Sequence, residues 1–273
     1  MTHDYEVSPF SSIDNLCDYL KRKPVDYGSI VDPSTQVLAL GEVHTREITK
    51  QEIIDNLKRF KELGFTHLGL EAFRSDFQTE LDEYQETGEN EEAVVEDIQN
   101  SFGKYSPNTT MLYLQMLDQA KQIGIKTVAI NMPRPMYESN QGHGLDAGSL
   151  RDQWMAEMVQ RVIEDKNERK IVTFTGQYHV ESSPRTMVGN LAQHGVKIVG
   201  VDFAGGAPSK RKACEIAASK IGASNERFMV KFNANAPYDW IIHLPQVEGE
   251  TEIEVLMGML SQQPIPLMNR FYV

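Results

Sequence analysis

The sequence predicts an α/β fold with a mainly parallel central sheet, helices on both faces of that sheet and an inserted helical cap. Short runs of aliphatic and β-branched residues alternate with helical segments over most of the chain. These runs are almost continuously apolar, as expected for strands that are covered on both faces in a parallel sheet. About fifty residues of helical character separate two of the runs, and ordinary connections between strands and helices are far shorter.

The five clearest strands follow this apolar pattern. We expect them at residues 37–40, 67–70, 127–130, 171–174 and 198–201. Two further strand-like runs, at residues 227–232 and 240–244, are expected to form an edge hairpin, and one more helix is expected between residue 208 and the first of them.

Three helices between the strands have recognisable starts. The segment Thr49–Glu52 has the residues of a capping box, and an apolar stripe follows it up to Gly64. Ser149 is expected to open a second helix, and Ser183 followed by Pro184 a third, which ends near Gly195.

The whole chain is predicted to form one domain. Its 273 residues include 40% hydrophobic residues, enough for one sizeable core. We therefore expect a single α/β domain over residues 1–273, in which residues 75–124 form the helical cap. The acidic stretch at residues 83–96 within the cap is expected to be a solvated helix face.

Composition excludes several classes of partner. The chain has 27 Lys and Arg against 39 Asp and Glu, and this net charge of −12 argues against a surface that follows nucleic-acid phosphates. The sequence shows neither a secretory signal nor a membrane-spanning run, so we expect a cytoplasmic protein with no membrane partner. Cys17 and Cys214 are too few for a disulfide framework and are expected to be reduced.

Glu42 and His44 form the first candidate site, in the segment Gly41–His44 at the end of the first strand. Side chains two residues apart on an extended chain project to the same side. A neighbouring carboxylate and imidazole can bind a divalent cation or exchange a proton. A surface hydrogen bond between the two side chains is the alternative.

Glu71 and His179 complete the candidate site. Glu71 ends the second strand, and ligands of open parallel sheets bind outside the carboxyl ends of the strands. His179 ends Gly176–His179, a second Gly-x-x-His segment directly after a strand. Pairing of either residue with a buried partner is the structural alternative. Together with Glu42 and His44, they suit a Mn, Co, Zn, Ni or Fe(II) ion with a bound water.

Arg151 and Tyr178 are further candidates. Arg151 lies in the first turn of the Ser149 helix, in register with its apolar face, where a cation opposes the helix dipole. It is expected either to bind a developing oxyanion or to form a salt bridge with Glu42 or Glu71. Tyr178 lies inside the second Gly-x-x-His segment and could donate to an oxyanion.

Four segments in this order resemble the motifs of the Tiki/ChaN-like/erythromycin esterase superfamily, with the ChaN-like branch closest. They are Gly41-Glu42-Val43-His44, Leu70-Glu71, Arg151-Asp152-Gln153-Trp154-Met155-Ala156 and Gly176-Gln177-Tyr178-His179, and the resemblance covers residues 36–202. It implies a ChaN/EreA-like α/β fold with a site at the strand ends. It matches His44 and His179 to the family's paired histidines, Glu71 to its acidic residue, and Glu42 to the acid beside the first histidine.

This resemblance implies activities that differ between branches: metal-dependent peptidases in the Tiki branch, macrolide ester hydrolysis in the esterase branch and haem binding in ChaN. We predict a metal-dependent hydrolase that cleaves an amide or ester bond. Its metal would be held by His44, Glu71 and His179, with Glu42 as a ligand or general base and Arg151 beside the oxyanion.

Two alternatives remain open at this point. One is a haem- or ligand-binding protein without turnover, with Tyr or His as axial ligand. The other is metal-free hydrolysis with His44 as general base. The expected partner is a small-molecule or peptide substrate, and a homodimer is possible.

Overall fold

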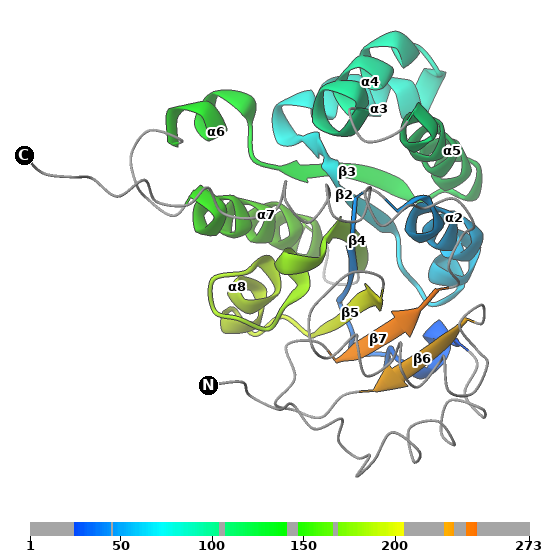
Figure 1. The fold of residues 1–273 in the computed structure, drawn as a ribbon, viewed down its shortest axis with the longest axis vertical. Coiled ribbons are helices and arrows are strands. Elements are labelled where there is room, and N and C mark those ends of the chain that lie inside the picture. The colour runs from blue at the N-terminus through cyan, green and yellow to red at the C-terminus, as the bar shows by residue number, and fades with distance from the viewer. Residues whose placement is uncertain are drawn as a thin grey trace, which may run out of the picture.

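Over the residues that the structure describes, the central sheet has seven strands in the order β3-β2-β4-β1-β5-β7-β6 (Figure 1). A computed structural model describes residues 25–44, 46–103, 107–140, 147–165, 169–204, 227–231 and 239–244. Among the described residues, neighbouring strands run parallel except the last pair, in which β6 runs antiparallel to β7. The predicted α/β class with a mainly parallel sheet is confirmed.

The strands coincide with the predicted apolar runs and extend beyond most of them. They are β1 (Val37–Glu42), β2 (His67–Arg74), β3 (Lys126–Asn131), β4 (Ile171–Gly176), β5 (Ile198–Ala204), β6 (Phe228–Lys231) and β7 (Trp240–His243). In register, Glu42 pairs with Gly176 across β1 and β4. The carboxyl ends of these central strands therefore meet at one edge of the sheet.

Helices cover both faces of the sheet (Figure 1). One core cluster joins alternate strand residues, such as Leu38 and Leu40, to α2 (Glu47–Glu62) and α5 (Pro107–Ile123). The intervening strand residues, such as Ala39, pack in a second cluster with α7 (Ala147–Glu164) and α8 (Met187–Gln193). Because successive strand side chains point to opposite faces, continuously apolar strands require cover on both sides.

Several helices lie between β2 and β3. They are the 3₁₀ turn η2 (Ser75–Phe77), α3 (Gln78–Thr87), α4 (Glu91–Ile98), the π-helical turn η3 (Gln99–Gly103) and α5. Their buried residues, among them Leu81, Val94 and Ile98, belong to the first core cluster. The division of the chain into one domain with a cap at residues 75–124 stays a prediction.

Two of the predicted helix starts are wrong. The first helix begins at Glu47 with Arg46 as N-cap, three residues before Thr49, the N-cap that the capping-box pattern predicts. Thr49 lies inside the helix, where its hydroxyl donates to the carbonyl oxygen of Arg46 at 2.7 Å instead of capping. The helix expected at Ser183 begins at Met187, because Thr186 caps it by accepting a hydrogen bond from Gly189 N. The third start, at Ser149, is two residues later than that of α7.

The remaining described elements are one short helix, two 3₁₀ turns and the edge hairpin. Helix α6 (Arg134–Asn140) follows β3, and the 3₁₀ turns η1 (Tyr27–Ser29) and η4 (Gln177–Val180) precede β1 and follow β4. The predicted edge hairpin is seen as the antiparallel pair β6 and β7. The helix expected after residue 208 lies outside the described residues. Over the part of the chain that is described, no helix combines the length and apolarity needed to cross a bilayer.

Candidate active site

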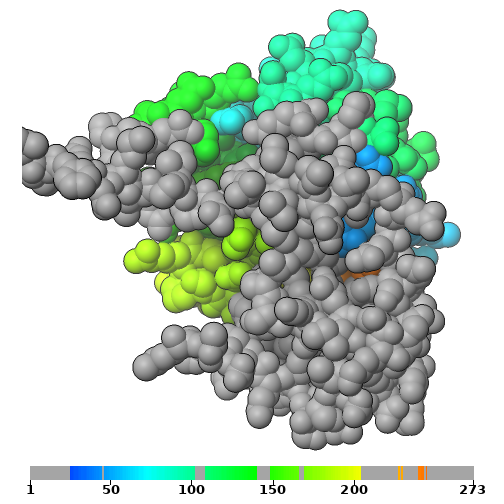
Figure 2. Space-filling model, in the orientation of Figure 1, coloured from blue at the N-terminus to red at the C-terminus, as the bar shows by residue number. Residues whose placement is uncertain are grey.

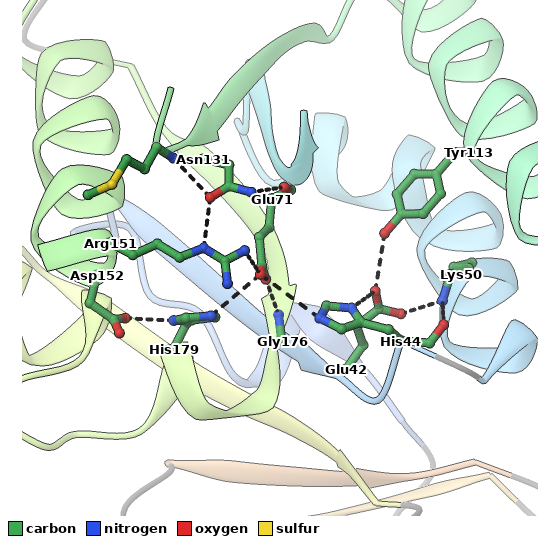
Figure 3. A network of polar contacts seen from close by, with 11 residues as sticks. Glu42, His44, Lys50, Glu71, Tyr113, Asn131, Arg151, Asp152, Gly176 and His179 are labelled. Atoms are coloured by element: carbon green, nitrogen blue, oxygen red, sulfur yellow. Dashed lines mark hydrogen bonds and ion pairs between the residues drawn. The ribbon is translucent and has the colours of Figure 1, made fainter. Parts of the chain in front are cut away.

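Side chains from four separate segments converge at the carboxyl edge of the sheet (Figure 3). Glu42 ends β1, Glu71 lies near the end of β2, His179 lies in η4 after β4, and Arg151 lies in the first turns of α7. His44 follows β1 by two residues. This convergence is what the carboxyl-end rule for open parallel sheets leads one to expect.

The Glu42 carboxylate is buried, with 1% of its surface exposed, and both of its oxygens accept hydrogen bonds. Oε2 accepts from Lys50 Nζ at 2.7 Å and lies 3.0 Å from the hydroxyl oxygen of Thr49. Oε1 accepts from Tyr113 Oη at 3.1 Å and contacts His44 Nδ1 at 2.9 Å. Burial raises the pKa of Glu42, but the Lys50 charge and the His44 contact outweigh it and lower that pKa to about 2. Glu42 is therefore an ionised carboxylate at neutral pH.

His44 pairs with this carboxylate through Nδ1, so its Nε2 is the ring nitrogen directed into the site (Figure 3). A carboxylate can only accept, so Nδ1 carries a proton, and any proton exchange between this ring and a bound molecule takes place at Nε2. Nε2 lies 3.9 Å from Glu71 Oε1, and 13% of the side chain is exposed. This is the arrangement of a general base that a carboxylate holds in one tautomer.

Glu71 is the centre of the second group of contacts, with 2% of its side chain exposed. Its Oε1 pairs with Arg151 Nη2, and its Oε2 accepts from the backbone N–H of Gly176. Burial raises the pKa of Glu71, but the charges of Arg151 and His179 outweigh it and hold that pKa well below its usual range. Arg151 also donates from Nε to Asn131 Oδ1 at 2.8 Å, and Asn131 donates to the Glu71 carbonyl oxygen at 2.9 Å.

His179 faces two carboxylates. Its Nδ1 lies 2.7 Å from Asp152 Oδ1, and its Nε2 lies 3.5 Å from Glu71 Oε1. Burial lowers the pKa of His179, but Glu71 and Asp152 together outweigh it and raise that pKa to about 9. The ring is therefore an imidazolium at neutral pH, and the site holds two histidines in different environments.

The remaining candidates differ in their relation to this group. Tyr178 is 51% exposed, and its proposed role at an oxyanion stays a prediction. Asn131, at the end of β3, contacts both Arg151 and Glu71, whereas Arg134 is exposed at the start of α6. His67 is buried at the other end of β2, away from the site.

Three residues of the network are not among the predicted site residues. Lys50 and Tyr113, each 1% exposed, hold Glu42 from α2 and α5, and Asp152 holds His179 from α7. Each lies on the buried stripe of its helix. Lys50 precedes Ile53, Ile54 and Leu57 at helical spacing. A polar residue at a core position of an amphipathic helix is therefore the signal that could have found them.

The predicted metal ligands do not fit a divalent ion in this arrangement. Within the described ranges, no group of three His, Cys, Asp or Glu side chains is placed to hold a metal. Both oxygens of Glu42 and both of Glu71 already accept hydrogen bonds. In this arrangement each carboxylate already has a partner: Lys50 pairs with Glu42, Arg151 with Glu71 and His179 with Asp152.

Comparison with known proteins agrees with this fold. Residues 33–149 match the family described as haem-binding uptake, Tiki superfamily, ChaN. That segment includes Glu42, His44 and Glu71 but ends before Arg151 and His179. A comparison with curated proteins gives no significant match.

Three solved structures share the architecture at low sequence identity. Erythromycin esterase mutant EreC H289N in its open conformation has a TM-score of 0.59 and 11% identity, covering 81% of this chain and 92% of that one. The type III effector HopBA1 has a TM-score of 0.56 and 13% identity over 90% of this chain and 100% of its own. ChaN of Campylobacter jejuni, described with cofacial heme binding, has a TM-score of 0.50 and 14% identity over 81% and 93%.

Fold and site together define an α/β protein with a carboxylate–histidine site at the strand ends. The predicted resemblance to the Tiki/ChaN-like superfamily agrees with the family match over residues 33–149. The ChaN and erythromycin esterase structures share the fold. At such identities the structural neighbours show the shared fold alone. What each neighbour binds or cleaves is a property of that neighbour.

Proposed function

We propose that this protein is a hydrolase that cleaves an ester or amide bond with His44 as general base and without a resident metal ion. The observation that carries the proposal is the contrast between the two histidines. His44 pairs with Glu42, whose charge Lys50 balances, and its Nε2 lies 3.9 Å from Glu71. His179 lies closer to its two carboxylates, at 2.7 Å from Asp152 and 3.5 Å from Glu71, and its pKa is raised. Paired titratable groups whose environments differ in this way are typical of acid–base catalysis.

The reaction would begin with a water molecule beside His44. Nε2 takes one proton from the water as its oxygen attacks the carbonyl carbon of the substrate, and the carbonyl oxygen becomes negative. When the bond to the leaving group breaks, the proton on His44 passes to the leaving atom, which is the oxygen of an alcohol for an ester and the nitrogen of an amine for an amide. The products are a carboxylic acid and that alcohol or amine.

Two cations lie where they can stabilise the negative oxygen. Arg151 has five N–H donors, of which Nε is used by Asn131 and one at Nη2 by Glu71, and 24% of its side chain is exposed. The imidazolium of His179 is 12% exposed. Fixed donors of this kind lower the barrier because they need no reorganisation during the reaction.

Hydrolysis assays after chelation test this proposal. The protein, prepared without a histidine tag and dialysed against EDTA, is assayed with 4-nitrophenyl acetate and with short peptide amides. We expect activity to survive chelation and His44→Gln to lower it by about 10²- to 10⁴-fold, the usual contribution of a general base. The exposed histidine His194 supplies the matched control, and His194→Gln should leave the rate unchanged.

The opposite results are equally clear. Loss of activity on chelation, with recovery on adding Mn, Co or Zn, would favour the metal-dependent mechanism predicted from the sequence. Equal rates for the wild type and His44→Gln would exclude His44 as the base.

The substrate class, a small molecule or peptide, and the cytoplasmic location are retained as predictions, as is the absence of nucleic-acid and membrane partners.

Haem binding is the second candidate function. It is supported by the family match over residues 33–149 and by Tyr178, which is 51% exposed directly before His179. A phenol oxygen is a known axial ligand of haem iron, so Tyr178 would hold haem and the iron would supply ligand binding or redox chemistry. Titration with hemin tests it: a Soret band that Tyr178→Phe abolishes supports haem binding, and a band unchanged by that substitution removes Tyr178 as the ligand.

A further inference from the structure

Arg74 is a cation at the edge of the site, and its guanidinium makes few polar contacts with the part of the chain that the structure describes. It ends β2, three residues after Glu71, and its Cα is in register with that of Asn131 at the end of β3. Asn131 in turn accepts a hydrogen bond from Arg151. Arg74 therefore belongs to the same carboxyl edge of the sheet as the candidate active site.

The contacts of Arg74 are unusual for a half-buried arginine. Its Nε is buried and has no hydrogen-bond partner. No ion pair to Arg74 is found among the described residues, whereas Arg59, Arg151, Arg169 and Arg227 all have one. Among the described residues, the guanidinium makes a cation–π contact with Tyr137 in α6, whose ring centroid lies 5.4 Å from Arg74 Cζ. An unpaired guanidinium packed on an aromatic ring is ready to receive an oxyanion through its fork of N–H groups.

The surroundings of Arg74 contain charges of both signs. Burial and the charges of Arg134 and Arg151 lower its pKa, while Asp97 and Asp76 act in the opposite sense. Burial is also the main reason that the pKa of Asp97 is raised to about 6, so this carboxylate compensates less of the positive charge of Arg74.

In the space-filling view, the cyan segment around the end of β2 reaches the surface between α6 and the teal helices α3 and α4 (Figure 2).

We propose that Arg74 binds an anionic group, a carboxylate or a phosphate, of the molecule that enters this site. The hydrolase would then select an ester or amide that carries a negative charge on the side of the reacting bond nearest α6. A protein of net charge −12 otherwise repels anions, so arginines gathered at this edge of the sheet would focus such a substrate on the site. This specificity rests on the proposed function, but the binding of an anion does not.

Direct binding is measured first, because it does not require turnover. Succinate and inorganic phosphate are titrated into the protein separately by calorimetry. Intrinsic fluorescence gives a second signal, since Trp154 donates to Ser75, the residue after Arg74, at 3.1 Å. We expect saturable binding of at least one anion, weakened tenfold or more by Arg74→Met and less by Arg74→Lys. Arg59→Met is the matched control, an exposed arginine of α2, and should bind as the wild type does.

The two anions also identify the source of the negative charge: tighter binding of succinate indicates a carboxylate, and tighter binding of phosphate indicates a phosphate ester. His44→Gln should bind the anion normally, so loss of hydrolysis alone does not affect this part of the test. Equal affinity of the wild type and Arg74→Met for both anions, or no binding of either by the wild type, would overturn the proposal.

Specificity is measured second, with two esters that differ in charge. Mono-4-nitrophenyl succinate carries a carboxylate, and 4-nitrophenyl butyrate is neutral. We expect Arg74→Met to lower kcat/KM for the charged ester tenfold or more, chiefly through KM, and to leave the neutral ester unchanged. An equal loss for both esters would show that Arg74 acts on the fold and not on specificity. If neither ester is cleaved by the wild type, the hydrolase proposal fails and the binding result alone decides the role of Arg74.

Discussion

Lys50 Nζ lies 2.7 Å from Glu42 Oε2, and both side chains are only 1% exposed. The same ammonium donates to the His44 carbonyl oxygen at 2.8 Å and to that of Arg46 at 3.3 Å. All three of its N–H groups therefore have acceptors. A single buried lysine thus joins the first turn of α2 to both the carboxylate and the backbone that position His44.

Lys50→Met is expected to destabilise the protein strongly. Removing one partner of a buried ion pair leaves the other charge uncompensated, which costs about 3–5 kcal/mol of the free energy of unfolding. Urea denaturation measures this change. Lys58→Met, on an exposed face of the same helix, is the control and should change it by less than about 0.5 kcal/mol.

A double variant checks the cause. If the loss arises from the unpaired Glu42 carboxylate, adding Glu42→Gln to Lys50→Met should recover part of it, because the buried charge is then removed. Additive losses in the double variant would mean that Lys50 stabilises the loop after β1 by another route.

Apolar patterning predicted the sheet well, because each strand is covered on both faces and its sequence has few polar residues. It also located Glu42, His44, Glu71 and His179, since each follows an apolar run and the topology brings the strand ends together. The hydrogen bonds and ion pairs of these four residues could not be predicted in the same way, because many of their partners lie on helices, which the apolar pattern of the strands does not position. Which of Glu42 and Glu71 would pair with Arg151 was left open by the sequence, and the structure shows that it is Glu71.

Helix starts were the weakest part of the prediction. Ser, Thr and Asp side chains make several kinds of local hydrogen bond, so a capping pattern in sequence does not fix which residue is the cap. Thr49 illustrates this, because its hydroxyl donates to the Arg46 carbonyl oxygen and lies 3.0 Å from Glu42 Oε2. Both contacts depend on the folded arrangement of the site.

The raised pKa of His179 predicts how stability depends on pH. The folded-state pKa of about 9 lies above the ordinary value of 6.5 for an unfolded chain, so the folded state binds the proton more tightly. The resulting stabilisation is fully present below pH 6.5 and is lost as the pH rises through 9. Its upper limit is of the order of 3 kcal/mol. Denaturation at a series of pH values from 6 to 10 measures it.

Asp152→Asn provides the comparison for this pH dependence. The variant removes one of the two carboxylates that favour the imidazolium, so its stability should fall less between pH 6.5 and 9. The His179 ring resonances, followed by NMR, should titrate at lower pH than in the wild type. Parallel stability curves for the two proteins would show that Asp152 does not set the charge of His179.

Arg151→Lys tests the requirement for a guanidinium. Arg151 spans Asn131 through Nε and Glu71 through Nη2, and an ammonium cannot reproduce that fork. We expect kcat for ester hydrolysis to fall about 10- to 100-fold while the melting temperature changes little, because the positive charge beside Glu71 is kept. Arg161→Lys, on the same helix, is the control. An unchanged kcat would remove Arg151 from the proposed stabilisation of the oxyanion.

The glycines that begin the two Gly-x-x-His segments have different neighbours, so substitutions at them are expected to differ in effect. A Cβ at Gly41 would lie 2.4 Å from Val180 Cγ2 and 3.0 Å from the Cα of Gln177, both in η4. A Cβ at Gly176 would instead lie 3.1 Å from His44 Nε2 and 3.5 Å from Glu71 Oε2. The first glycine therefore lets η4 pack on β1, and the second leaves room for the side chains of the site.

Gly41→Ala should accordingly lower the free energy of unfolding by about 1–3 kcal/mol, the usual cost of overpacking, because the buried turn η4 must move. It should also lower activity, since His179 moves with the turn. Gly176→Ala should lower activity with a smaller loss of stability, because the His44 side chain can shift by a few tenths of an ångström. Denaturation and ester hydrolysis, measured on both variants, separate the two effects. If Gly176→Ala retained full activity, a change in the position of His44 Nε2 would have no effect on the reaction, contrary to the role proposed for it.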